Sequence, residues 1–340
     1  MSSTEPPAKR QRTDGDSDAE IIRSTDFWLD DGTIILQVEA TQFRVNKSVL
    51  GRHSTVFHDM FTMPLPPDEP LVEGCPVVVL SGDSVEDWCD LLGLMYPKTI
   101  LGTPSMKVVL AVLRLGKKYD MQAFYQDCLR RLRALFPDTL EAWKAQLETP
   151  DKHITDIPGF YLPCAVVLRN LGLFSLLPAL YYKLLTDGQA ADRQLQSLLE
   201  PTTQNPSELL IQAVVARGHL SLLDLQRSNN FTWLYSTFLS PPGWATGCTT
   251  NAVCRRAVDS ARELVEDYGT PLYALEPWDA EWEEVENDDA DSGDEVTRLC
   301  SHCVARAKAT FEAGRGRCWE RLPSVFGLPV WDELKKLDLE

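Results

Sequence analysis

Residues 25–63 decide how this chain is organised, and they read TDFWLDDGTIILQVEATQFRVNKSVLGRHSTVFHDMFTM. Within them, residues 34–39 and 41–46 each contain alternating apolar and polar side chains. That period of two is typical of strands in a sheet with one buried face and one face in water. Only Ala40 separates the two runs, so the pattern predicts a tight hairpin.

Helical spacing begins directly after this hairpin. The positions that would share one helical face are Val49, Leu50, His53, Val56, Phe57, Met60 and Phe61. Their recurrence every three or four residues predicts a helical pair. A hairpin that leads directly into two helices is a compact nucleus, and we expect later helices to pack on it.

These residues resemble the opening of a BTB/POZ domain. The pattern of that family is an aspartate, a hairpin, a phenylalanine, a small apolar residue, a histidine with a basic residue, then leucine, serine and phenylalanine. The matching positions are Asp31, Phe43, Val45, Lys47, Leu50, Ser54 and Phe57. Asn46 departs from it, because the family usually has histidine there. The flanking DFW and DMFTMP sequences are similar to those of BTB proteins from mushroom-forming fungi, and the resemblance continues to about Pro137.

The resemblance implies an α+β fold in which residues 21–137 form a BTB/POZ domain with a small sheet and a helical cluster. The expected core residues are Phe43, Val45, Leu50, Phe57 and Met60. Self-association as a homodimer is also implied. Members of the family often hold an aspartate close to a basic residue near the dimer groove, here Asp31 and Lys47. A charge buried there needs a partner, so we expect an ion pair; the alternative is a simple surface pair.

Composition divides the rest of the chain. Residues 1–20 carry almost no bulky apolar side chain, which indicates a disordered tail. Residues 138–240 have the pattern of an all-α extension, and helices directly after a BTB domain suggest a BACK-like arrangement. Residues 241–340 form a C-terminal region that contains cysteines and five of the nine tryptophans.

An acidic run interrupts this C-terminal region. Residues 276–295 contain 11 acidic residues and no basic one, and removing those charges from the net −17 leaves −6 for the rest of the chain. We expect a solvated acidic loop that includes Trp278 and Trp282, the alternative being an activation-like segment. The ending at residues 318–334 is similar to endings of the same fungal proteins. We expect its aromatic side chains to dock on the helical domain rather than to form a free peptide motif.

The charge and the hydropathy pattern exclude several partners. A net charge of −17 argues against phosphate-backbone binding, so we expect no direct nucleic-acid partner. No apolar run reaches the length that spans a bilayer, and residues 1–20 lack the apolar segment of a secretory signal. We therefore expect no membrane partner and a cytosolic or nuclear setting in which thiols stay reduced.

A basic cluster near the start predicts a nuclear location. Residues 6–14 read PPAKRQRTD and resemble a monopartite nuclear import signal, with Lys9, Arg10 and Arg12 as its basic residues. Import receptors bind extended basic segments, so a disordered tail suits this role. The alternative is a solubilising tail on a cytoplasmic protein, because short basic clusters also occur by chance.

The nine cysteines include one pair with metal-ligand spacing. Cys300 and Cys303 have the two-residue gap of a zinc knuckle, and Cys248 and Cys254 could supply the second pair. Four thiolates would close a tetrahedral zinc site across the acidic run. In the alternative reading these cysteines are small hydrophobic residues and the chain has no cofactor. Four others lie in apolar elements and are expected in the core: Cys75, Cys89, Cys128 and Cys164.

No catalytic motif is found, so we expect no enzyme: the sequence has no phosphate-binding glycine loop, no nucleophile elbow and no His-Glu-x-x-His.

Three interaction roles stay open. The first is a BTB dimer in a nuclear regulator that binds a corepressor-like protein. The second is a cullin ubiquitin-ligase adaptor; many such proteins have a hydrophobic-x-Glu motif, for which Glu69 is present but Pro67 occupies the apolar position. The third is a purely structural self-assembly protein.

Overall fold

The structure is a computed structural model, and its described residues fall into two compact units. The sheet unit comprises Met1–Pro104 and Ala111–Tyr125, and the helical unit comprises Ser105–Leu110 and Gln126–Glu340. Each unit is described by itself. The described residues are 20–64, 71–98, 102–148, 160–186, 206–235, 247–267, 274–278, 282 and 298–338.

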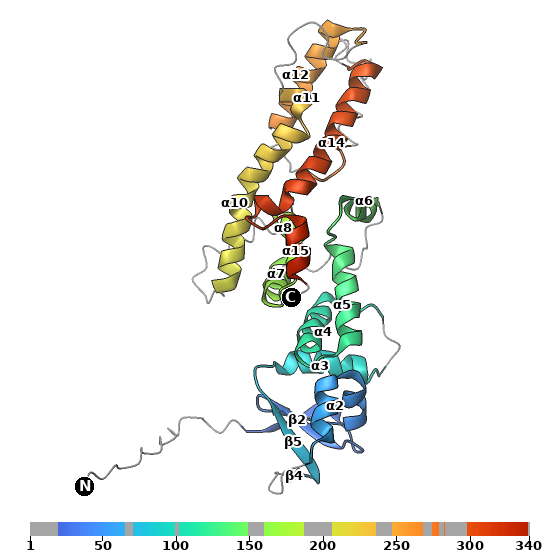
Figure 1. The fold of residues 1–340 in the computed structure, drawn as a ribbon, viewed down its shortest axis with the longest axis vertical. Coiled ribbons are helices and arrows are strands. Elements are labelled where there is room, and N and C mark those ends of the chain that lie inside the picture. Colours follow the sequence, from blue (N-terminus) through green and yellow to red (C-terminus); the bar gives the residue numbers. More distant parts are fainter. Residues whose placement is uncertain are drawn as a thin grey trace, which may run out of the picture. The chain divides into compact units, whose positions relative to one another are not determined.

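A five-stranded sheet forms the base of the sheet unit (Figure 1). Its strands are β1 (Ile22–Trp28), β2 (Ile34–Val38), β3 (Thr41–Val45), β4 (Leu71–Val72) and β5 (Cys75–Leu80). Their order is β1-β3-β2-β5-β4. The predicted hairpin is confirmed: β2 and β3 pair antiparallel with Val38 opposite Thr41. Strand β1, which pairs parallel with β3, was not predicted.

The sheet curls so that its two ends are tied together. Glu73, in the turn between β4 and β5, forms ion pairs with Arg23 of β1 at 2.7 Å and with Arg44 of β3 at 3.2 Å. Cys75 also donates from Sγ to the carbonyl oxygen of Gly32 at 3.2 Å. These contacts close the small sheet around its buried face.

Two short helices follow the hairpin, as its pattern predicts. They are α1 (Lys47–His53) and α2 (Thr55–Thr62), and Ser54 separates them. The Ser54 hydroxyl accepts from the Phe57 N–H at 3.0 Å and donates to the Tyr119 carbonyl at 2.5 Å, which caps α2 and ties it to a later helix. Four of the five expected core residues are buried: Phe43, Val45, Leu50 and Phe57. Met60 is only half-buried, a correction to the expected core.

Helix α3 (Val85–Met95) begins after Ser84, whose hydroxyl caps it by accepting from the Asp87 N–H at 3.1 Å. The next helix is α4 (Met106–Lys118). The Ser105 hydroxyl accepts from the Val108 N–H at 3.5 Å, so this serine marks the helix start. Helix α5 (Gln122–Leu135) follows, and α4 and α5 both contribute residues to the two units.

The helical unit contains the later helices (Figure 1). They are α6 (Leu140–Glu148), α7 (Tyr161–Asn170), the short η1 (Phe174–Leu176), α8 (Leu177–Thr186), α10 (Pro206–Asn229), α11 (Thr232–Tyr235), α12 (Asn251–Asp267), α14 (Ser301–Val325) and α15 (Trp331–Leu337). Among the described residues, no helix is both long and apolar enough to span a bilayer.

The long helices α10 and α14 pack closely because glycines lie where they meet. A Cβ on Gly314 would lie 2.6 Å from the backbone of Asn229, and one on Gly218 would lie 2.6 Å from the ring of Phe326. Contacts shorter than 3 Å require the surrounding atoms to shift. The two glycines therefore set the separation of the helices.

The predicted docking of the C-terminal aromatic residues on the helical domain is confirmed, because the Phe326 ring lies 5.4 Å from that of Tyr181 in α8 and the Trp319 ring lies 5.9 Å from that of Trp143 in α6. The Trp331 ring stacks on Trp319 with centroids 5.1 Å apart, and its Nε1 donates to the Trp319 carbonyl at 2.8 Å. Asp338 accepts from the backbone N–H of Ser175 at 3.0 Å. The end of the described chain is thus fixed to α14 and η1.

Candidate interaction surface and metal centre

Strand β1 is an edge strand of the sheet, and its parallel pairing with β3 is irregular between Arg23 and Trp28. Phe27 is its one buried residue, and the Phe27 ring lies 6.5 Å from that of Phe43. Two ion pairs add to this anchor, Arg23 with Glu73 and Asp26 with Lys98 at 2.6 Å. Their side chains are largely exposed, so each pair contributes at most about 1 kcal/mol.

Apolar side chains are exposed where β1 begins and on α2. Ile21 and Ile22 are 53% and 60% exposed, and Val56 and Met63 are also exposed. An edge strand with apolar neighbours is a template on which another strand can pair. The start of β1 is therefore a described surface of the sheet unit that can bind a further polypeptide.

The structure does not form the expected ion pair between Asp31 and Lys47. Asn46 takes the place of the lysine: its Nδ2 donates to the Asp31 carbonyl at 3.1 Å and to the Asp31 carboxylate at 3.3 Å. The Lys47 ammonium lies 5.6 Å from the ring centroid of Phe61 instead. Asp31 is exposed, so its charge needs no buried partner. The departure at Asn46 thus changes the local pairing while the fold is kept.

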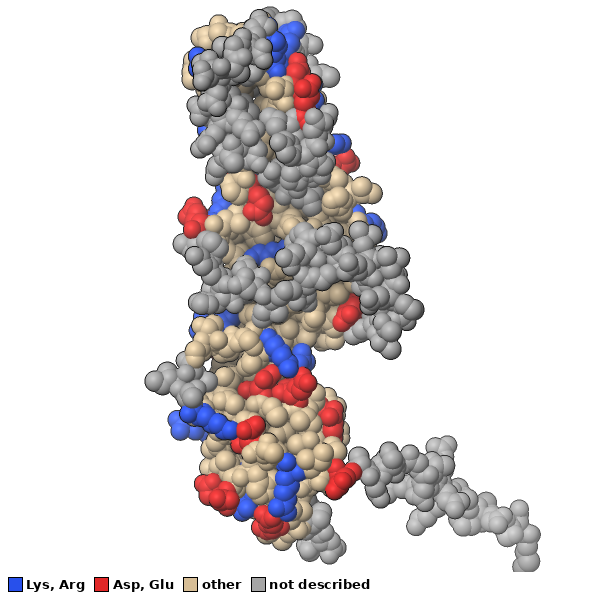
Figure 2. Space-filling view, turned by 180° about the vertical axis from the view of Figure 1, so that it is seen from behind, with Lys and Arg blue, Asp and Glu red and all other residues tan. Residues whose placement is uncertain are grey.

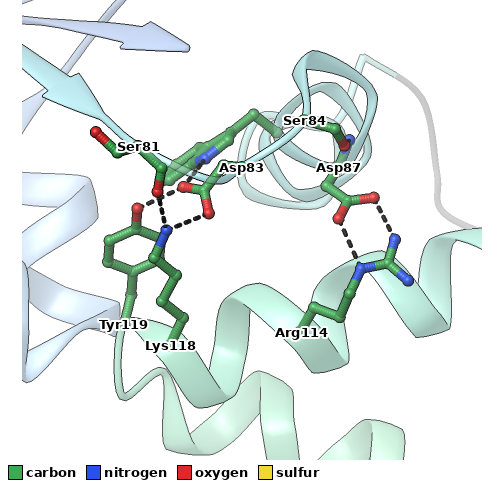
Figure 3. Close-up of polar contacts among 8 residues, drawn as sticks. Ser81, Asp83, Ser84, Asp87, Arg114, Lys118 and Tyr119 are labelled. Atoms are coloured by element: carbon green, nitrogen blue, oxygen red, sulfur yellow. Dashed lines mark hydrogen bonds and ion pairs between the residues drawn. The ribbon is translucent and has the colours of Figure 1, made fainter. Parts of the chain in front are cut away.

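A buried polar network connects α3 to α4 in the sheet unit (Figure 3). The Asp83 side chain is only 3% exposed and accepts from Lys118 at 2.5 Å, from Trp88 Nε1 at 3.0 Å and from the Tyr119 hydroxyl. Burial, with the Asp83 carboxylate as a further cause, raises the pKa of Tyr119 well above its usual range. Three donors satisfy this buried carboxylate, as a buried charge requires.

Asp87 and Arg114 form the second part of this network. Their side chains make a two-point ion pair, with nitrogen–oxygen distances of 2.8 and 2.5 Å. The capping position of Ser84 and Asp87 could be predicted from the sequence. The partners could not, because Arg114 and Lys118 on α4 and Tyr119 directly after it lie 27 to 36 residues further along the chain. The network fixes α3 on α4 and has no feature of a catalytic site.

The four predicted metal-ligating cysteines come together in the helical unit. Cys248 precedes α12 and Cys254 lies near its start, whereas Cys300 caps α14 and Cys303 lies in its first turn. Their sulfur atoms all lie within 4.8 Å of one another, and those of Cys248 and Cys300 are 4.0 Å apart. Sulfurs around a tetrahedral zinc ion with 2.3 Å bonds are about 3.8 Å apart. The cluster therefore has nearly the dimensions of a four-thiolate site.

Donors converge on these thiols. The Cys300 N–H donates to Cys254 Sγ at 3.2 Å. Burial alone would raise the pKa of the Cys300 thiol, but hydrogen bonds from the backbone N–H groups of Thr249 and Cys303 outweigh it and lower that pKa to about 6. Burial raises the pKa of the Cys303 thiol. The starts of α12 and α14 add positive helix ends, which favour thiolates.

Gly247 allows the loop to bring Cys248 into the cluster. Its φ of +104° is a backbone conformation that residues with a side chain rarely adopt, and the His302 ring lies 3.5 Å from where a Cβ would be. Gly247 was not among the residues predicted to form the site. A glycine directly before a candidate ligand is a signal that could have pointed to it.

The cysteine cluster is part of an aromatic core. Cys254 and Cys303 are buried in the same cluster as Phe231, Trp233, Trp278, Trp282 and Phe311. The rings of Trp278 and Trp282 are 4.6 Å apart. The expectation of a solvated loop around these two tryptophans is thereby corrected, since they are 1% and 6% exposed. Their large apolar surface outweighs the charge of the neighbouring acidic residues.

Several predicted residues lie outside the described part of the chain: Lys9, Arg10 and Arg12 of the import cluster, Pro67 and Glu69 of the cullin motif, and most of the acidic run. On the face shown in Figure 2, acidic and basic side chains of the described residues are interspersed among uncharged ones. That distribution differs from the one-sided basic surface of a nucleic-acid binder.

Comparison with known families identifies the first of the two units. The model of the BTB/POZ domain family matches residues 29–134. A search of curated proteins found no match, so the fungal type indicated by the flanking sequences stays a prediction. BTB/POZ is an interaction domain and not a catalytic family, which is consistent with a protein that is not an enzyme. The chain therefore contains a BTB/POZ domain at residues 29–134, followed by helices and a cysteine-rich C-terminal region.

Proposed function

We propose that this chain is a nuclear scaffold or regulator whose BTB/POZ domain self-associates through β1. The observation that carries the proposal is the edge strand β1, which has one buried residue and exposed Ile21 and Ile22 at its start. An edge strand can add a partner strand through its backbone groups. A second copy of the chain is the occupant that we propose, because self-association is what the BTB/POZ family implies.

The charges of β1 support a second copy in particular. Closed dimers are usually two-fold symmetric, so two copies of β1 would run antiparallel. If Ser24 lies opposite Thr25 of the other copy, Arg23 lies opposite Asp26 on both sides of the axis. Opposite charges at such cross-strand positions stabilise the pairing, and like charges destabilise it. The strand is therefore complementary to itself.

Charge reversal tests this arrangement. Asp26→Arg places two arginines opposite each other in the dimer, and Arg23→Asp places two aspartates there, so each variant alone should sediment mainly as a monomer. A mixture of the two variants restores both opposite-charge pairs and should give a heterodimer of twice the chain mass. Asp59→Arg, the same charge change at a 76% exposed side chain of α2, is the control and should stay dimeric. A wild-type monomer, or variants that dimerise alone as well as mixed, would refute the β1 dimer.

The nuclear location rests on the basic cluster of Lys9, Arg10 and Arg12. Replacing all three with alanine should move a fluorescent fusion of the full chain from nucleus to cytoplasm. Replacing three exposed basic residues elsewhere, Arg133, Arg321 and Lys336, removes the same charge and should leave the fusion nuclear. Nuclear retention of the first variant would exclude this cluster as the import signal.

A cullin ubiquitin-ligase adaptor is the second candidate function. It is favoured by the helical unit that follows the BTB/POZ domain, since such adaptors combine a cullin-binding domain with a second, substrate-binding part. Calorimetry of the full chain with a cullin N-terminal domain distinguishes the two roles. Micromolar or tighter binding would support the adaptor, whereas a folded dimer that binds no cullin would support the scaffold.

A further inference from the structure

We propose that Cys248, Cys254, Cys300 and Cys303 bind one Zn²⁺ ion as four thiolates, in a structural site that closes the helical unit around its aromatic core. The proposal is independent of the function of the BTB/POZ domain. Zinc is the metal that we infer because four sulfur ligands in a compact cluster suit it, and because its structural sites are four-coordinate. Binding releases the protons of those cysteines that are still thiols.

The burial of the four side chains favours ligands over simple packing. Cys254 and Cys303 are buried, as small hydrophobic residues would be, but Cys248 and Cys300 are only half-buried. Apolar packing gives no reason for these two sulfur atoms to meet at 4.0 Å at the edge of the core. A metal ion accounts for all four positions, because its ligands must converge whether or not each is buried.

The surroundings of the cluster also fit bound thiolates. The Cys300 N–H points to Cys254 Sγ, and Thr250 Oγ1 lies 3.4 Å from the same sulfur. Such hydrogen bonds orient metal ligands and offset the negative charge of a four-thiolate site. Four protein ligands leave no position for water or substrate, so the site would be structural and not catalytic.

The ion would join two segments that are distant in sequence. Cys254 and Cys300 are separated by 45 residues, and that interval contains Trp278, Trp282 and the acidic run. Two of the thiols pack in the same core as these tryptophans. Zinc binding would therefore hold together the start of α12, the start of α14 and the aromatic side chains between them, and its removal should loosen that core.

Metal analysis of the full chain is the first test. Protein purified under reducing conditions should carry about one zinc per chain, and chelation of that zinc should expose four additional thiols to a thiol reagent. Co²⁺ added to the chelated protein should give the visible absorption of a tetrahedral thiolate site. Folded, reduced protein that takes up neither ion would refute the proposal. So would thiols that appear only after a reductant is added, since these would come from disulfides.

A matched pair of variants localises the site. Cys303 and Cys318 both have 0% exposure and lie on α14, but only Cys303 belongs to the cluster. Cys303→Ala should lower zinc affinity at least tenfold, whereas Cys318→Ala should retain about one zinc. Chelation should shift the tryptophan fluorescence of the wild type and of Cys318→Ala, but not that of Cys303→Ala. Equal zinc content in the two variants would refute the assignment, and if Cys303→Ala does not fold, the Co²⁺ spectrum of the wild type decides.

Discussion

The sheet unit and the helical unit obtain their stability from different ranges of the sequence. In the sheet unit, β2, β3, α1 and α2 follow one another within residues 34–62, so local patterns place the part of the core that these elements contribute, including Phe43, Val45, Leu50 and Phe57. In the helical unit the decisive contacts join distant residues, such as Gly314 with Asn229 and Cys300 with Cys248. The comparison teaches that the hairpin and the helical pair of the first unit can be predicted from periodicity, whereas the contacts of its later helices and those of the second unit depend on individual residues that meet only after folding.

The largest effect should come from the core of the sheet unit. Phe57 is 1% exposed and contacts the rings of Trp88 and Tyr119, with centroids 5.9 and 4.9 Å away. Phe57→Ala should lower the free energy of unfolding by about 3–5 kcal/mol, measured by urea denaturation. Val56→Ala, at a 45% exposed neighbour, should cost less than about 1 kcal/mol. Equal effects would mean that this cluster is not the core that the periodicity indicates.

In the helical unit, adding one methyl group at Gly314 of α14 should push this helix away from α10. Gly314→Ala places a Cβ 2.6 Å from the Asn229 backbone, so it should destabilise the unit by about 2–3 kcal/mol. Gly316→Ala on the same helix meets nothing within 4 Å and should stabilise it by about 0.5–1 kcal/mol, because alanine is the better helix former. Thermal unfolding of both variants checks the opposite signs, and destabilisation by both would contradict the close packing.

These glycines show the limit of sequence-based prediction. The alternation at Phe43 and Val45 predicts their burial without knowledge of any partner. Nothing local distinguishes Gly314 from Gly316, because the difference between them is the position of α10. The cysteine cluster could be predicted only in part. The spacing of Cys300 and Cys303 indicated a pair of ligands, but only the fold brings Cys248 and Cys254 close to that pair. Trp278 and Trp282 were misjudged because charge dominates their sequence neighbourhood.

The pKa of Lys183 in the helical unit can be tested through the dependence of stability on pH. Burial lowers the pKa of Lys183 to about 8 from 10.5, although Glu276 opposes the shift. Between these values the unfolded chain binds more protons, so this residue makes the folded state more stable as pH rises. The stability advantage of Lys183→Met over the wild type should therefore shrink by about 2 kcal/mol from pH 8 to 10.5. A stability difference between Lys183→Met and the wild type that stays constant over this pH range would contradict the lowered pKa of Lys183.

Asp83, the buried carboxylate of the sheet unit, is surrounded by hydrogen-bond donors, so removing its charge should destabilise the unit. Asp83→Asn keeps the size of the side chain but removes its charge, and its NH₂ group then faces the donors Lys118 and Tyr119. We expect a loss of about 1–2 kcal/mol in urea denaturation. Asp59→Asn, at a 76% exposed side chain, should change stability by less than about 0.5 kcal/mol. If the two variants behave alike, the network of Figure 3 does not stabilise the unit.

The central claim is that β1 joins two copies of the chain, and hydrogen–deuterium exchange at several protein concentrations tests it most directly. Peptides that cover Ile22–Trp28 should become more protected as concentration rises through the dimerisation range, whereas peptides from α12 and α14 should not change. Protection of β1 that is independent of concentration, or a dimer that protects only other segments, would contradict the account.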